Sequence, residues 1–97
     1  MNLAICAAIR SRRVIQFSYD GDNRVVEPFC HGTSTAGKDL LRAYQVRGQS
    51  ASGTPSGWKL FEESKITGLR QTGEVFTGTR QDYNPNDSAM AIMHCHV

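Results

Sequence analysis

The chain has 97 residues, a net charge of +2, 39% hydrophobic residues and nine glycines. This length permits one domain with a single modest core, and the composition excludes a disordered chain. A surplus of two positive charges does not by itself indicate a nucleic-acid-binding protein. No apolar run reaches the roughly 18 to 20 residues that cross a bilayer, and the N-terminus lacks the pattern of a signal peptide. We therefore expect a cytoplasmic protein with no membrane partner.

One short amphipathic helix is predicted at the N-terminus. Asn2 is a residue type that caps helices, and apolar residues follow it at three- and four-residue steps: Leu3, Ile5, Cys6 and Ile9. A helix of about ten residues is unstable alone in water, so it must pack against the rest of the domain. Its other face is rich in alanine, which is compatible with light exposure or with a contact to another subunit.

Five short antiparallel strands are predicted to follow the helix, over residues 14–19, 25–30, 40–47, 58–62 and 71–77. Pro28 confines the second strand to a sheet edge or a bulge. The polar loop over residues 48–57 is expected to be mobile, and a single helical turn is expected over residues 64–69. A tail with a short helix over residues 89–93 is expected to end the chain.

This order of elements predicts a mainly β fold. One N-terminal α-helix followed by five sequential strands is typical of a small SH3-like or Sm-like five-stranded barrel. We expect residues 1–82 to form this single barrel domain and residues 83–97 to form a C-terminal tail.

The cysteines and histidines do not indicate a disulfide framework or a metal site. Cys6, Cys30 and Cys95 are odd in number and widely spaced, so free thiols in a reducing compartment are expected. Zinc-ligating residue types occur at Cys30-His31 and at residues 94–96, but without the paired spacing of zinc sites. We expect no metal and no cofactor, and we assign no role to His94-Cys95-His96.

Two pairs of basic and aromatic residues are the main functional signal. Arg42 precedes Tyr44 by two positions, and Lys59 precedes Phe61 by two positions, each within a predicted strand. Residues at i and i+2 of a strand point to the same face, so each pair would present a charge and a ring together. Such a face suits a ligand that is both anionic and flat. The alternative is that both rings belong to the core and both cations reach water at strand ends.

The predicted binding site joins these pairs to two further residues. It consists of Tyr19, Arg42, Tyr44, Lys59, Phe61 and Lys65, with Arg10, Arg12 or Arg13 approaching from the end of the helix. The cations would pair with phosphates and the rings would stack on bases.

Several segments resemble a known family in their order and spacing. They are residues 8–19 with an Asp-Gly turn, Val26-Glu27-Pro28, Leu41-Arg42-Ala43-Tyr44, Lys59-Leu60-Phe61 and Lys65-Ile66. Together they resemble the WYL domain over residues 3–69. The resemblance implies an Sm-like, SH3-like barrel that senses a ligand, in some cases single-stranded nucleic acid, and a bacterial or phage origin. WYL domains usually follow a DNA-binding helix-turn-helix in transcription regulators, and we expect a stand-alone, truncated or divergent member without that region.

These observations predict a non-enzymatic, ligand-sensing or regulatory module that binds an anionic ligand, foremost nucleic acid or a nucleotide. No catalytic residues are assigned, because Cys30 and His31 are strand neighbours and would point to opposite faces. The alternative is a structural protein–protein interaction module or a homo-oligomer with no small ligand. A small RNA-binding Sm-like protein is a further possibility. The expected partners are thus single-stranded nucleic acid or a nucleotide, a second copy of the chain, or a regulatory protein.

Overall fold

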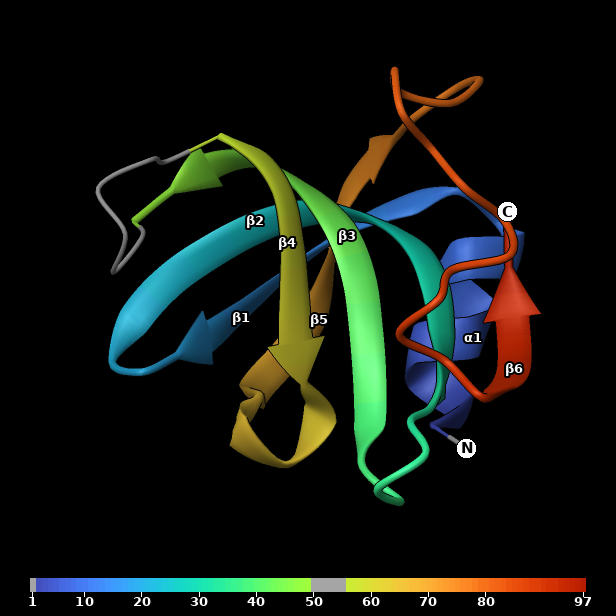
Figure 1. Cartoon of the computed structure of the whole chain (residues 1–97). Coiled ribbons are helices and arrows are strands. Elements are labelled where there is room, and N and C mark those ends of the chain that lie inside the picture. Colours follow the sequence, from blue (N-terminus) through green and yellow to red (C-terminus); the bar gives the residue numbers. More distant parts are fainter. Residues whose placement is uncertain (1, 50–55) are drawn as a thin grey trace.

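The computed structural model describes residues 2–49 and 56–97 and is mainly β with one α-helix (Figure 1). The elements are α1 (Leu3–Arg10), β1 (Arg13–Tyr19), β2 (Asp22–Thr33), β3 (Asp39–Gly48), β4 (Gly57–Glu62), the 3₁₀ turn η1 (Glu63–Lys65), β5 (Thr67–Val75) and β6 (Ile92–His96). Within these ranges no helix is long and apolar enough to span a membrane. Most of the loop predicted over residues 48–57 lies outside the described residues.

The helix and the first four strands agree with the sequence prediction. The Asn2 side chain caps α1 by accepting a hydrogen bond of 3.0 Å from the backbone N–H of Ile5. Asp20 and Gly21 both have positive φ values, of 53° and 78°, which is the conformation of a two-residue hairpin turn between β1 and β2. The helical turn predicted over residues 64–69 is shorter than expected, because η1 covers only Glu63–Lys65 and β5 begins at Thr67.

All strand pairs are antiparallel and belong to one open sheet. The strand order is β4-β3-β2-β1-β5, and β6 pairs with the second half of β2. The long β2 strand can pair with three neighbours because β1 takes its first half and β6 takes its last residues, Cys30 to Thr33. The β2–β3 register shifts between Pro28 and Cys30, so of the two alternatives predicted for the proline, a sheet edge or a bulge, the structure has the bulge.

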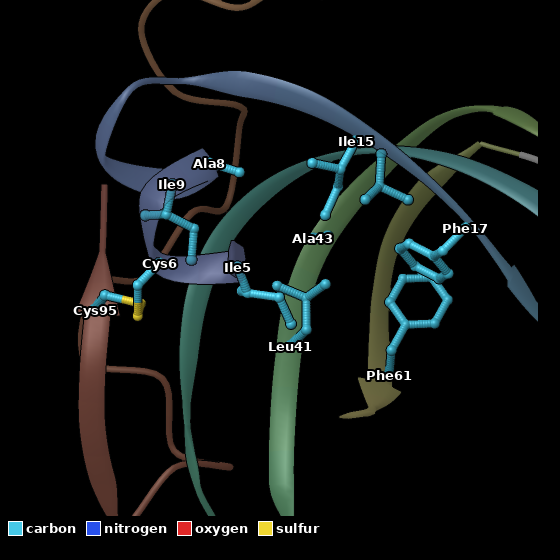
Figure 2. Packing of buried hydrophobic residues seen from close by; sticks show 11 residues of the cluster. Ile5, Cys6, Ala8, Ile9, Ile15, Phe17, Leu41, Ala43, Phe61 and Cys95 are labelled. Carbon is cyan, nitrogen blue, oxygen red and sulfur yellow. A yellow bond between two sulfur atoms is a disulfide. The ribbon is translucent and has the colours of Figure 1, made fainter. Parts of the chain in front are cut away.

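Both faces of this sheet are buried. Pairs of adjacent apolar residues send one side chain to each face, because successive strand residues point in opposite directions: Val14-Ile15, Val25-Val26 and Leu40-Leu41. On the first face, the apolar side of α1 packs over the second member of each pair (Figure 2). On the second face, residues 76–93 cover the first members, and Phe76 and Met90 are buried there.

The C-terminal region differs from the tail predicted over residues 83–97. No helix forms over residues 89–93; instead Ile92–His96 make the sixth strand, which was not predicted. The backbone N–H of Val97 also donates a hydrogen bond of 2.9 Å to the Phe29 carbonyl oxygen. Gly32 of β2 permits the start of β6 to lie close against it, since a Cβ on Gly32 would collide with the carbonyl oxygen of Ile92. The C-terminal region folds onto the sheet because the apolar side chains of the second face need a cover that excludes water.

The prediction of three free thiols is wrong. Cys6 of α1 and Cys95 of β6 form a disulfide that spans 89 positions of sequence (Figure 2). Both cysteines belong to the core between α1 and the first face of the sheet. Cys30 has a free thiol and belongs to the core on the second face. Burial raises the pKa of the Cys30 thiol above its ordinary value. The sheet therefore separates the one free thiol from the disulfide.

Reduction of the Cys6–Cys95 disulfide is expected to lower the melting temperature. In the chain-entropy model, a cross-link that closes a loop of this length stabilises the folded state by about 4 kcal/mol or more. Calorimetry with and without dithiothreitol measures the effect. The double variant Cys6→Ser, Cys95→Ser is the control, and its melting temperature should not respond to the reductant. An equal melting temperature of the natural chain in both conditions would contradict a stabilising role.

Candidate functional site

Five of the six predicted site residues lie in strands, and the sheet divides them between its two faces, whereas Lys65 lies in η1. Residues directly opposite each other in an antiparallel pair share a face. Tyr44 lies opposite Trp58, so Arg42 and Tyr44 belong to the second face. Phe61 lies opposite the core residue Leu41, so Lys59 and Phe61 belong to the first face. Each cation shares a face with its ring, as the spacing predicts, but the two pairs do not form one surface.

On the first face, the predicted rings are part of the protein core. Phe61 is 1% exposed, and its ring lies 5.0 Å from that of Phe17 and 4.9 Å from that of Tyr19. The Tyr19 hydroxyl accepts a hydrogen bond of 3.1 Å from the backbone N–H of Glu62. Lys65 forms an ion pair of 3.5 Å with the Glu62 carboxylate. For Phe61, the alternative assignment to the core is therefore confirmed, and Tyr19, for which no such alternative was given, is partly buried against the same core.

A cation that was not predicted, Arg24, lies against these rings. Its guanidinium carbon lies 5.6 Å from the centre of the Tyr19 ring and 5.8 Å from that of Phe61. The buried Arg24 donates a hydrogen bond of 3.4 Å to Gln45 and lies 3.7 Å from the Asp22 carboxylate. An internal guanidinium thus already occupies the position beside these rings that a cation or a flat ligand would take.

On the second face, two hollows share Trp58 and Asp82, and we call them together the Trp58 groove. The first has a volume of about 230 Å³ and is lined mainly by Arg42, Trp58, Asp82, Tyr83, Asn84 and Asp87. The second has a volume of about 430 Å³ and is lined by Tyr44, Gly57, Trp58, Arg80, Gln81 and Asp82. The groove thus lies between the β3–β4 hairpin and the segment that follows β5.

Aromatic rings held in fixed positions form one part of the groove. The Trp58 and Tyr83 rings are stacked, with centres 6.1 Å apart and planes inclined by 16°. The Tyr44 and Trp58 rings meet edge to face, with their centres 5.5 Å apart. The indole N–H of Trp58 donates a hydrogen bond of 2.8 Å to the Gln81 carbonyl oxygen, and the Tyr83 hydroxyl donates one of 2.8 Å to that of Val97. These contacts hold the half-buried Trp58 in the orientation of a stacking platform.

Two guanidinium groups flank the rings, and each is paired with a carboxylate. Arg42 donates from Nε and Nη2 to the two oxygens of Asp87, at 2.7 and 3.3 Å. Arg80 donates in the same way to Glu27, at 2.8 and 3.0 Å, and lies 4.3 Å from the centre of the Tyr44 ring. Both forks have the bidentate geometry with which arginine also binds phosphate.

The surroundings of the Asp87 carboxyl favour its charged form. Its burial alone raises the pKa, but the hydrogen bonds from Arg42 and from the Ala89 backbone N–H more than offset this effect. The pKa of Asp87 therefore lies below its ordinary value. The groove thus contains an anion that is fixed against Arg42 at neutral pH.

The sequence did not assign most of the groove to a site. Arg42 and Tyr44 were predicted as site residues, whereas Trp58 and residues 80–88 were not. The Arg42–Asp87 ion pair joins positions 45 residues apart, so no local pattern reveals it. The only local signal was an aromatic residue, Tyr83, among polar residues in a segment with no predicted strand.

The histidines have structural contacts. The ring of the fully buried His31 contacts the Leu40 carbonyl oxygen through Nδ1 at 2.8 Å, and its Nε2 accepts a hydrogen bond of 3.1 Å from the Asn2 backbone N–H. His94 lies 2.8 Å from the Thr33 hydroxyl. Over residues 2–49 and 56–97, no three His, Cys, Asp or Glu side chains come together in a group that could hold a metal ion.

Comparison with known proteins finds no family model, no curated protein and no solved structure that matches the chain. The functional argument therefore depends on the geometry of the groove.

Acidification is expected to remove the contribution of the Arg42–Asp87 pair to stability. The folded pKa of Asp87 lies below the unfolded value of about 3.9. The pair therefore stabilises the fold fully above that pH, and this contribution is lost as the pH falls through the lower folded pKa. Asp87→Asn should lower the free energy of unfolding by about 1 to 3 kcal/mol at pH 6 and by less near pH 3, where the loss of the contribution has begun. Urea unfolding at both pH values measures this.

The control for this prediction is Asp20→Asn, which removes an equal charge from an exposed turn. It should leave the pH dependence unchanged. A deficit of Asp87→Asn that is the same at both pH values would refute the role of the ion pair.

Proposed function

We propose that the chain is a non-enzymatic, ligand-sensing module that binds a nucleotide or a short single strand of nucleic acid in the Trp58 groove. One observation carries this proposal: a bidentate arginine, Arg42, and a fixed aromatic stack, Trp58 with Tyr83, line the same hollow. A base stacked on an aromatic side chain contributes on the order of 1 to 3 kcal/mol. The guanidinium fork would hold a phosphate of the same ligand.

Binding at Arg42 would be an exchange of anions. The Asp87 carboxylate occupies the two donors that a phosphate would take. A phosphate offers the same pair of oxygens and a larger charge, so it can replace the carboxylate without leaving the guanidinium unpaired. This exchange would move Asp87 and the segment that carries it, which provides a signal that a partner protein could detect.

The proposal includes a barrel of SH3-like or Sm-like type and membership of the WYL family. The support is the curl of the sheet. Although two strands separate β1 from β4 in the strand order, the rings of Phe17 and Tyr19 on β1 contact that of Phe61 on β4, and the Tyr19 hydroxyl accepts a hydrogen bond from the β4 backbone. A flat sheet could not bring these strands together. The resemblance of residues 3–69 to the WYL domain supports the same fold and a ligand-sensing role.

A second candidate function is association with another copy of the chain or with a regulatory protein. Leu3 of α1 is 71% exposed and Ile92 of β6 is 59% exposed, which are high values for such apolar side chains. A dimer on a sizing column that Leu3→Ser converts to a monomer would support this function.

The proposed cytoplasmic location has a direct test in the state of the thiols. Because reducing compartments keep thiols free, a cytoplasmic location predicts that Cys6 and Cys95 are unbonded in the cell, contrary to the disulfide in the structure. Acid quenching of cells, then alkylation in denaturant without a reductant and mass spectrometry, should in that case label all three buried cysteines. Labelling of Cys30 alone would show the disulfide in place and would contradict the cytoplasmic location.

Ligand binding is expected to change the fluorescence of Trp58, the one tryptophan of the chain. Titration with a mixed-sequence tetranucleotide at low salt should quench it, because a base would stack on the indole. Arg42→Gln should weaken binding about tenfold or more, since a charge-assisted hydrogen bond is lost.

The matched control is Arg70→Gln, which removes the same charge from an exposed position of β5 outside the groove. It should bind as the natural chain does. Absence of quenching up to millimolar oligonucleotide, or equal affinities of the Arg42 and Arg70 variants, would refute the proposal.

A further inference from the structure

Asp82 is an acceptor without a partner beside the stacking platform. Its side chain lines both hollows of the Trp58 groove. In the described part of the chain, its carboxylate makes no hydrogen bond and no ion pair. Asp82 lies at the end of an exposed turn, where no internal contact requires a carboxylate. It therefore adds to the groove two acceptor oxygens that the fold does not use.

The turn that carries Asp82 is fixed relative to Trp58. The indole N–H binds the carbonyl oxygen of Gln81, the preceding residue, at 2.8 Å. The backbone N–H of Tyr83, the following residue, donates to the Arg80 carbonyl oxygen at 3.1 Å. Asp82 itself has a φ of 68°, in the left-handed region that aspartate and asparagine tolerate better than most residues. The backbone that carries the Asp82 side chain is thus held beside the ring by the contacts of both neighbours.

Asn84 supplies donors in the same hollow. Its Oδ1 accepts a hydrogen bond of 2.9 Å from the backbone N–H of Asn86, which fixes the orientation of the amide. The two N–H groups of Nδ2 make no hydrogen bond in the described structure. The first hollow therefore offers two adjacent acceptors from Asp82 and a donor from Asn84 next to Trp58.

We infer that the first hollow of the Trp58 groove selects guanine, with Asp82 as the residue that determines this specificity. The inference rests on the proposed nucleotide-binding function. The Watson–Crick edge of guanine presents two adjacent N–H donors, at N1 and N2, followed by the O6 acceptor. A carboxylate accepts from both donors, and the Asn84 amide donates to O6. Adenine presents an acceptor at N1, which would face the Asp82 carboxylate unpaired, and cytosine offers a single amino donor.

The charge of Asp82 favours this role over general anion binding. A carboxylate beside Trp58 repels a phosphate, so it would weaken a site that recognised charge alone. It is useful where the ligand presents N–H donors near the ring and places its phosphate at Arg42, in the same hollow. The arrangement thus separates a base-reading end from a phosphate-binding end.

Calorimetric titration with the four nucleoside monophosphates GMP, IMP, AMP and CMP tests the inference. GMP should bind about tenfold or more tightly than AMP, as expected for one bidentate contact. IMP, which lacks only the N2 amino group, should bind more weakly than GMP. Asp82→Asn should remove the preference for GMP over AMP, because an amide offers one acceptor in place of two.

The matched control is Asp20→Asn. Asp20 is also exposed in a turn with a left-handed φ, of 53°, but lies between β1 and β2 and outside the groove. This variant should keep the preference for GMP. Equal affinities for GMP and AMP, or a preference that survives Asp82→Asn, would overturn the inference while nucleotide binding stands. Failure of all four nucleotides and of the tetranucleotide to bind would overturn the proposed function and this inference together.

Discussion

The Cys6–Cys95 disulfide is the constraint on which the arrangement of the two faces depends. It joins α1, which covers the first face, to β6, which is the end of the segment that covers the second (Figure 1). The cover of the second face has no helix or strand between the end of β5 and the start of β6. Such a segment has few backbone hydrogen bonds of its own, so its attachment at both ends determines its position. One covalent bond therefore secures the covers of both faces.

The groove depends on the core of the second face. The Phe29 ring lies 5.1 Å from Trp58, 5.1 Å from Tyr83 and 5.2 Å from Phe76. Trp58 comes from β4 and Tyr83 from the covering segment, and the buried Phe29 brings them together. The rings that would bind a base thus rest directly on the core. Loss of packing at Phe29 would disturb the groove and the fold at the same time.

Local patterns in the sequence were sufficient for the elements that depend on neighbouring residues. The cap at Asn2 and the Asp-Gly turn were predicted and are present, and the bulge at Pro28 is one of the two alternatives predicted there. The adjacent apolar pairs, such as Leu40-Leu41, were a signal that both faces of the sheet are covered, since a half-exposed strand alternates. That signal implied a second cover, for which residues 76–93 were the remaining candidate. The disulfide gave no such signal, because its cysteines are 89 positions apart.

The predicted site was divided because spacing within one strand does not determine the register between two strands. The i, i+2 rule places Arg42 with Tyr44, and Lys59 with Phe61, but says nothing about how one pair faces the other. In the structure Tyr44 lies opposite Trp58. A shift of one residue would place it opposite Lys59, and all four side chains would share one face. The register between two strands is determined by the packing of both cores. It therefore cannot be read from the residue pattern of either strand alone.

The groove is lined by as many acidic as basic groups, which limits how it can recognise a ligand. Arg42 and Arg80 are accompanied by Asp82 and Asp87, and Arg80 is also paired with Glu27. Long-range attraction for an anion is therefore weak, in agreement with the net charge of +2. Affinity must come from contacts made at close range: a base on the Trp58 ring, a phosphate in place of Asp87, and the pattern of donors and acceptors at the base edge. Since each carboxylate penalises a ligand that does not match it, the same acidic groups that reduce general anion binding increase selectivity for one ligand.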